Sequence, residues 1–152
     1  MAKTKAKPKK DNLIFGEIAP YKPKAREKYM NEKQQEHFRQ ILKLWKKQLL
    51  EEMERTVHHL QDEATNLPDP NDRATLEEEF SLELRTRDRE FKLINKIDQS
   101  LNELDNGQHS EYGYCESCGV EIGIPRLEAR PTATLCIDCK ELDEIKEKSR
   151  AG

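Results

Sequence analysis

The sequence predicts a mostly α-helical protein. We expect a long antiparallel helical hairpin of the coiled-coil type, a small four-cysteine zinc module and a short C-terminal helix. Three observations support this prediction: two long segments each carry one apolar stripe, a proline-containing break separates them, and all four cysteines form two C-x2-C pairs. We divide the chain into a disordered basic tail (1–11), a segment that packs on the globular end (12–30), the hairpin (31–107, tip 67–74) and the zinc module with its C-terminal helix (108–152).

The composition restricts the kind of core that the chain can build. Only 34% of the residues are hydrophobic and 38% are charged, which suits a narrow seam between two helices better than a wide core. The 27 basic and 30 acidic residues give a net charge of −3, which does not fit a dedicated DNA-binding protein. No apolar run approaches the roughly 20 residues that span a bilayer. The lysine-rich start is not followed by an apolar segment, so we expect a cytosolic protein with reduced cysteines.

The first long helix has a clear start signal. Asn31 is a good N-cap, and Gln34 three residues later completes a capping-box pattern. No Gly or Pro follows until Pro68. The apolar residues recur at steps of three or four, which predicts one stripe along one face. The stripe consists of Phe38, Leu42, Trp45, Leu49, Met53, Val57, Leu60 and Ala64.

The stretch "NLPDPNDRAT" (66–75) interrupts the helical pattern. Pro68 and Pro70 are expected to end the first helix, and Asn71 or Asp72 to begin and cap the second. At 1.5 Å per residue each helix is about 50 Å long, which places this break at the far end of a rod. The second stripe consists of Phe80, Leu84, Phe91, Ile94, Leu101 and Leu104.

Two polar residues, Arg87 and Asp98, fall within the second stripe. We expect Arg87 to extend its charged end to solvent or to pair across the seam. Gly107 is expected to stop the second helix. Two such helices joined by a few residues must run antiparallel.

The cysteine pattern is the most specific signal in the sequence. Cys115, Cys118, Cys136 and Cys139 form two C-x2-C pairs with 17 residues between them, within the range of structural zinc sites. Zinc takes four ligands in a tetrahedron, and a four-thiolate shell leaves no position for a reacting water. A redox-active C-x-x-C or an iron–sulfur cluster would also use cysteines, but the paired spacing favours zinc.

The zinc module needs the metal because its own core is small. We expect that core to contain Val120, Ile122, Ile124, Leu127 and Leu135. The segment "KELDEIKEKSR" after Cys139 is expected to form a short amphipathic helix, with Leu142 and Ile145 on one face.

Several motifs together resemble a known family. "YGYCESCGVEIGIPRLEARPTATLCIDCK", "YMNEKQQEHFRQIL", "HLQDEATNLPDPNDRA" and "EEEFSLELRTRDRE" closely resemble the DksA/TraR zinc-finger family of bacterial transcription factors, in its zinc-containing form. The resemblance covers nearly the whole chain from about Tyr21. It implies a non-enzymatic regulator that binds RNA polymerase as a monomer, through the secondary channel and its rim, without binding DNA. It also implies action with ppGpp in the stringent response, repressing ribosomal RNA promoters and assisting some amino-acid biosynthesis promoters.

The resemblance also implies site residues. The family's tip motif corresponds to "DPNDRA", which makes Asp69, Asp72 and Ala74 the tip residues. The family's ppGpp site, formed with the polymerase, corresponds to Leu93, Lys96, Arg130 and Lys140. Asn95 stands where a basic residue is common in the family.

Two other functions can be tested against this one. Carboxylates at the tip could hold a catalytic Mg²⁺ in the polymerase and promote transcript cleavage, but such catalysis needs firm placement and these residues lie on a turn. A zinc ribbon could also bind nucleic acid, but the zinc segment carries few cations and the dense basic run is the N-terminal tail.

Overall fold

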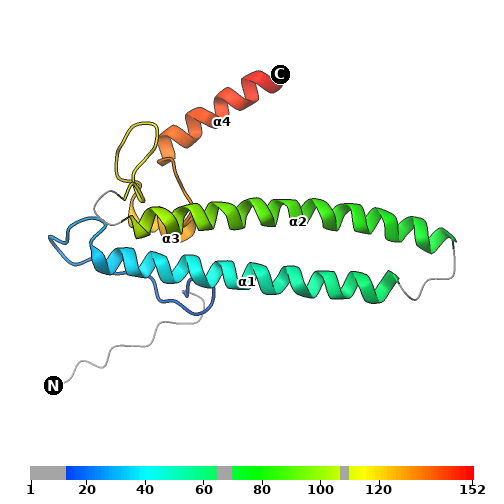
Figure 1. Ribbon diagram of the computed structural model, residues 1–152. Coiled ribbons are helices and arrows are strands. Elements are labelled where there is room, and N and C mark those ends of the chain that lie inside the picture. The colour runs from blue at the N-terminus through cyan, green and yellow to red at the C-terminus, as the bar shows by residue number, and fades with distance from the viewer. Residues whose placement is uncertain (1–12, 65–69, 107–109) are drawn as a thin grey trace. The chain divides into compact units, whose positions relative to one another are not determined.

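The computed structural model describes residues 13–64, 70–106 and 110–152, and these ranges are mostly helical (Figure 1). The helices are α1 (Glu32–Ala64), α2 (Pro70–Asp105), α3 (Ile124–Ala129) and α4 (Ile137–Ala151). Within the described ranges no strand forms, and the only β-bridges are isolated ones, Ile14 with Ile18 and Tyr114 with Glu121. No helix in this part of the chain is long and apolar enough to cross a membrane. The predicted fold class is confirmed.

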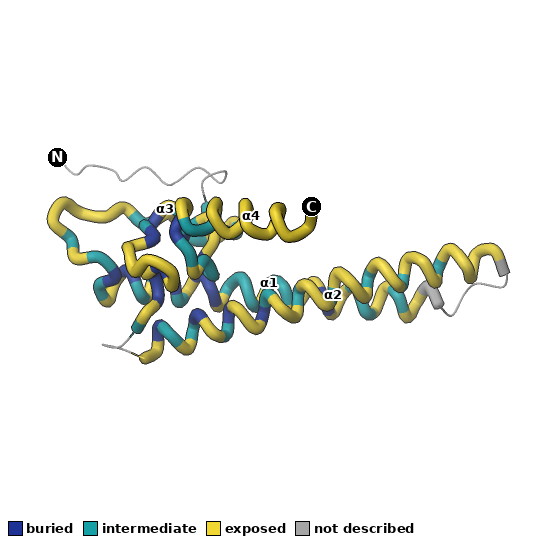
Figure 2. Tube along the Cα trace, turned by 90° about the horizontal axis from the view of Figure 1, so that it is seen from above, coloured by how far each residue is buried: buried dark blue, intermediate teal, exposed yellow. Residues whose placement is uncertain are grey.

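The chain falls into two compact units. One combines the described residues of Met1–Lys43 and Ser100–Gly152, and the other is Leu44–Gln99. We call them the zinc unit and the coil unit. Most of the buried residues belong to the zinc unit, as the dark blue segments in Figure 2 show. The four-part division made from the sequence stays a prediction.

The start of α1 in the zinc unit forms the predicted cap. The side-chain oxygen of Asn31 accepts a hydrogen bond from the backbone N–H of Gln34 at 2.9 Å. Gln34 is buried, and its side-chain oxygen accepts from the backbone N–H of Met30 at 2.6 Å. This reciprocal arrangement is the capping box, with its second bond shifted one residue back. The side-chain amide of Asn31 also donates to Glu27 at 2.7 Å.

The apolar stripe of α1 faces inward as predicted. Phe38 and Leu42 are fully buried in the zinc unit, and Met53 is 6% exposed in the coil unit. Ile41, which the predicted stripe omits, is fully buried as well. The remaining described stripe residues are half-buried: Trp45, Leu49, Val57 and Leu60. The side chain of Ala64 lies outside the described residues.

The predicted stripe of α2 is partly wrong. Leu84 and Phe91 are 56% and 50% exposed, whereas Glu83 and Glu90 are half-buried. The physical reason is the register of the helix pair. Positions that recur at alternating steps of four and three face the seam, and this sequence of steps passes through the two glutamates. These inward positions are Leu76, Phe80, Glu83, Arg87, Glu90, Ile94, Ile97, Leu101 and Leu104.

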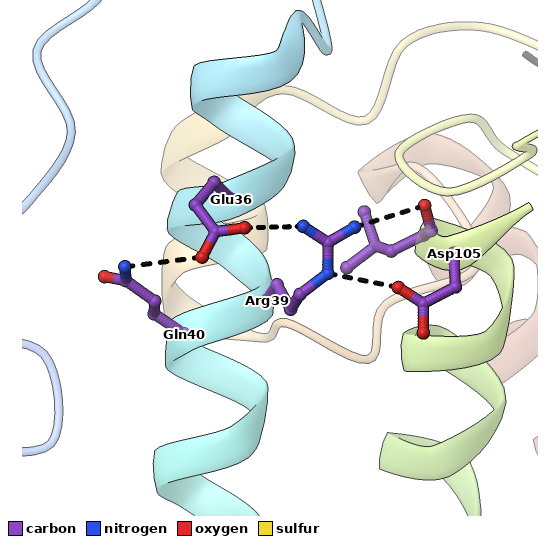
Figure 3. Close-up of polar contacts among 5 residues, drawn as sticks. Glu36, Arg39, Gln40 and Asp105 are labelled. Carbon is purple, nitrogen blue, oxygen red and sulfur yellow. Dashed lines mark hydrogen bonds and ion pairs between the residues drawn. The ribbon is translucent and has the colours of Figure 1, made fainter. Parts of the chain in front are cut away.

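Polar side chains also join the two long helices within each unit. In the coil unit Lys46 on α1 pairs with Asp98 on α2 at 2.7 Å. In the zinc unit Arg39 on α1 contacts Glu36 at 2.6 Å and Asp105 at 3.1 Å (Figure 3). Its guanidinium also donates to the carbonyl oxygen of Leu104 at 3.5 Å. The last turn of α2 contains no basic residue of its own, so Arg39 supplies the cation that suits a helix C-terminus.

The helix boundaries correct three further expectations. Pro70 does not end the first helix but begins α2, so Asn71 and Asp72 lie inside its first turn and do not cap it. Helix α3 is absent from the sequence prediction, although Pro125 near its start is a usable signal. Helix α4 begins at Ile137, before the expected segment, and includes Cys139.

The predicted apolar faces of the C-terminal region are also partly exposed. Val120 is 51% exposed and is not part of the core. Leu142 and Ile145 are 58% and 59% exposed, and α4 buries no residue. Ile122, Ile124 and Leu127 are buried as expected, and Leu135 is half-buried. Gly107 lies outside the described residues.

Replacing the cap of α1 should destabilise the protein. The Asn31→Ala variant loses the bond to the backbone N–H of Gln34, and we expect its free energy of unfolding to fall by about 1 kcal/mol. Chemical denaturation followed by circular dichroism measures this change. Asn102→Ala, at an exposed position inside α2, is the matched control and should cost much less. Equal effects of the two substitutions would show that the cap contributes nothing.

Candidate functional site

The first cysteine pair sits on a tight turn in the zinc unit. The backbone N–H of Cys115 donates to Val120 at 2.8 Å, and the N–H of Gly119 donates to the carbonyl of Cys115 at 2.9 Å. Gly119 has φ +77°, a conformation that strains any residue with a Cβ. The turn therefore holds Cys115 and Cys118 on one side of the loop, as the glycine in the sequence indicates.

The second cysteine pair belongs to the start of α4. Cys136 is the N-cap residue of this helix, and Cys139 lies in its first turn. The N–H of Lys140 donates to the carbonyl of Cys136 at 3.0 Å, which closes that turn. The positive end of the helix dipole favours thiolates at these positions.

The four sulfurs are placed as a zinc ion requires. They all lie within 4.8 Å of one another, and the Sγ atoms of Cys118 and Cys136 are 3.7 Å apart. A tetrahedron with Zn–S bonds near 2.3 Å has sulfur–sulfur edges of about 3.8 Å. All four cysteines are free of disulfide bonds. The residues present therefore fit a structural zinc ion, which would cross-link the two turns and leave no open coordination position.

The pKa values of two thiols in the cluster are shifted in opposite directions. A backbone hydrogen bond from Cys136 lowers the pKa of Cys115 to about 6. A hydrogen bond with Cys136 raises the pKa of Cys139 to about 12. One thiol in the cluster thus ionises easily while another holds its proton through hydrogen bonds. Because zinc binds thiolates, zinc binding must release protons.

Tyr29, just before α1, connects the zinc module to the rest of the zinc unit. Its hydroxyl donates to the carbonyl of Gly113 at 2.9 Å and accepts from the N–H of Gly123 at 3.2 Å. Gly113 has φ +89°, and a Cβ there would lie 2.5 Å from the side chain of Met30. Sequence reasoning missed this role because the partners are 84 and 94 positions away from Tyr29.

Buried contacts complete this attachment. The hydroxyl of Tyr112 donates to the carbonyl of Pro131 at 2.6 Å, and burial raises the pKa of Tyr112. The rings of Phe38 on α1 and Tyr112 are 5.9 Å apart. His37 on α1 lies 3.2 Å from Glu128 on α3. The zinc module therefore shares one core with the beginning of α1.

The predicted tip residues are described only in part. Asp69 lies outside the described residues. Asp72 and Ala74 are both exposed in the first turns of α2. Asp72 is an acidic residue close to the positive end of the helix dipole, where it stabilises the helix.

The residues predicted to bind ppGpp are distributed over both compact units. Leu93 is half-buried and Lys96 exposed on α2 in the coil unit. In the zinc unit Arg130 is the exposed residue at the end of α3, and Lys140 on α4 lies 3.9 Å from Glu144. The assignment of these four residues to one site stays a prediction.

Comparisons with known proteins match both parts of the chain. Residues 34–104 match the family model of the DnaK suppressor protein DksA, N-terminal domain, and residues 110–144 match the prokaryotic dksA/traR C4-type zinc finger. The chain is 61% identical over 140 residues to "RNA polymerase-binding transcription factor DksA" of Escherichia coli K12, covering 92% of this chain and 91% of the relative. It is 62% identical over 140 residues to the protein of the same name from Haemophilus influenzae, with 92% and 94% covered.

A solved structure is similar as well. The structure of transcription factor DksA2 from Pseudomonas aeruginosa has a TM-score of 0.69 and 41% identity, covering 79% of this chain and 90% of that one.

The four-cysteine geometry and the two long helices define a helical zinc-finger protein of the C4 type. The chain belongs to the DksA family. Its relatives are named as transcription factors, so the family is one of regulators and not of enzymes.

Removing the metal should disorganise the zinc module more than the long helices. With a zinc chelator we expect one zinc ion to be released, with loss of the circular dichroism signal of α3 and α4, because their small core depends on the cross-link. Helix signal from α1 and α2 should largely remain. Cys118→Ser should behave like the chelated protein, and Ser117→Ala, next to it, should keep its zinc. Complete loss of helix on chelation would contradict this two-part stability.

Proposed function

We propose that this protein is a transcription regulator that binds RNA polymerase directly. The observation that carries the proposal is the 61% identity over 92% of the chain to a relative named as an RNA polymerase-binding transcription factor. The intact four-cysteine site supports it, because the zinc finger of that family is of the C4 type. A pull-down of purified polymerase by the zinc-loaded protein tests the proposal, and absence of a complex would overturn it.

We further propose that the tip between α1 and α2 enters the secondary channel of the polymerase. The motif "DPNDRA" supports this proposal, together with the exposure of Asp72 and Ala74. The side chain of Asp72 is free to face a partner because it does not cap α2.

The Asp72→Asn variant should separate binding from regulation. It keeps the size of the side chain and removes its charge, so we expect normal polymerase binding but loss of repression at a ribosomal RNA promoter. The loss of a favourable charge in the first turn should cost only about 0.5 kcal/mol of stability. In vitro transcription measures the regulation, and thermal melting measures the stability. Asp88→Asn, an exposed position on the same helix, is the control. Normal repression by Asp72→Asn would refute the role of the tip.

The proposal includes ppGpp as an effector bound together with the polymerase. The ligand is strongly anionic, and Lys96, Arg130 and Lys140 provide cations from three separate segments. Arginine forms bidentate bonds with phosphate, and lysine provides a mobile point charge. Lys96 and Arg130 are both exposed, which leaves them available to a ligand.

Substitution of these cations should affect only the ppGpp-dependent part of regulation. Lys96→Ala and Arg130→Ala should each keep the repression seen without ppGpp and lose most of the additional repression that ppGpp causes. Transcription assays over a range of ppGpp concentrations measure this difference. Lys43→Ala removes an exposed lysine of α1 and should respond like the wild type. A wild-type ppGpp response in both variants would eliminate this site.

We also propose that the protein acts as a cytoplasmic monomer, without binding DNA itself, in the stringent response. The net charge of −3 supports the absence of direct DNA binding, because phosphate neutralisation needs a basic surface. A gel shift without polymerase at physiological salt is the test. Tight, sequence-dependent binding would replace this proposal with that of a DNA-binding zinc finger.

A further inference from the structure

In the coil unit, α2 presents a charged face to α1. From Phe80 to Ile94 the buried or half-buried positions are Phe80, Glu83, Arg87, Glu90, Leu93 and Ile94, and the three between Phe80 and Leu93 are charged. Further along α2, toward its C-terminus, Ile94 and Ile97 are buried, with 7% and 0% exposure. Charged residues at three consecutive seam positions are costly, because each loses water on packing.

Hydrogen bonds and ion pairs only partly offset the cost of burying these charged side chains. The Nε atom of Arg87 is buried and has no hydrogen-bond partner. Burial raises the pKa of Glu90, and the nearby carboxylates of Glu52 on α1 and Glu83 on α2 raise it further, while Arg87 opposes them. Next to Glu83 lies a groove of about 370 Å³ that is also lined by Arg55 and His59 of α1. Side chains of the two helices therefore leave an open groove beside Glu83.

A second face of α2 is apolar over the same segment. Leu84 and Phe91 follow Glu83 and Glu90 directly in sequence, and more than half of Leu84 and half of Phe91 are exposed. Phe80, Leu84, Arg87, Phe91 and Ile94 recur at alternating steps of four and three, as a seam requires. Phe80, Arg87 and Ile94 belong to both faces, so the two glutamates would exchange with the two apolar residues.

The geometry points to a helix with two packing states. We propose that the segment of α2 from Phe80 to Ile94 can rotate about its axis, which moves Leu84 and Phe91 into the seam and Glu83 and Glu90 out to solvent. At 100° per residue, the mean directions of the two faces differ by roughly 40°. A rotation of this size leaves the three shared residues in the seam. On α1 the apolar partners are Met53, Val57 and Leu60, which are buried or half-buried already.

Protonation of Glu90 sets the balance between the two states. Its pKa in the charged-face state is raised above the ordinary value of 4.5, so that state is favoured when Glu90 is protonated. The contribution of Glu90 to the stability of the charged-face state is fully present below pH 4.5 and is lost as the pH rises through the raised pKa of Glu90. Rising pH therefore drives Glu90 toward solvent and Phe91 into the seam.

Fluorine NMR of the full-length, zinc-loaded protein tests the rotation. The chain has four phenylalanines, which can be labelled with 4-fluorophenylalanine, and the Phe91→Leu variant identifies the signal of Phe91. The change of that signal between H₂O and D₂O reports its exposure. We expect this isotope shift to be largest below pH 4.5 and to decrease as the pH rises through the raised pKa of Glu90. An isotope shift at Phe91 that is the same at every pH would overturn the proposal.

Matched variants show whether the glutamates are responsible. Glu83→Gln/Glu90→Gln keeps the shape of the protonated side chains, so Phe91 should stay exposed at every pH. Glu77→Gln/Glu78→Gln makes the same change at exposed positions of α2 and should keep the wild-type pH dependence. His59→Gln should keep it too, which excludes the histidine in the groove as the titrating group. If the Glu83→Gln/Glu90→Gln protein shows the wild-type pH dependence, the proposal is wrong, whatever its effect on stability.

Discussion

The shortage of apolar residues is the constraint that shapes this protein. With 34% hydrophobic residues, the chain can fill a seam between two helices and one small core. Phe38, Ile41 and Leu42, in the first part of α1, are fully buried, and the zinc module adds Tyr112 and Leu127 to the same unit. A metal cross-link contributes the stability that so small a core lacks, because it ties two turns that are far apart in sequence.

The zinc site and the helix start depend on each other. The cysteine turns position α3 and α4, and Tyr29, His37 and Phe38 join this module to α1 through three hydrogen bonds and a ring contact. The metal in this arrangement has no open coordination position, so its contribution to function is structural. The described residues proposed to act on the polymerase are not zinc ligands; they lie on α2, at the end of α3 and on α4.

In the coil unit, charged residues at seam positions of α2 lower the stability of the helix pair and favour a second packing. An apolar residue at each of Glu83, Arg87 and Glu90 would make a tighter seam, and the chain has Leu84 and Phe91 one position away. The charged layer instead leaves an unpaired buried Nε on Arg87 and a carboxyl with a raised pKa on Glu90. A weak seam of this kind gives two packings similar free energies, which is the condition for a population shift.

The sequence by itself determined the two long helical segments, the N-cap at Asn31 and the cluster of four cysteines that fits zinc, because caps, periodicity and cysteine spacing are local signals. It did not determine which face of α2 packs, since Leu84 and Phe91 fit one heptad pattern and Glu83 and Glu90 fit another. Nor did it reveal the bonds from Tyr29 to Gly113 and Gly123, or the exposure of Leu142 and Ile145 on α4. Tertiary structure decided these features, because each depends on which residues from distant parts of the chain lie opposite one another.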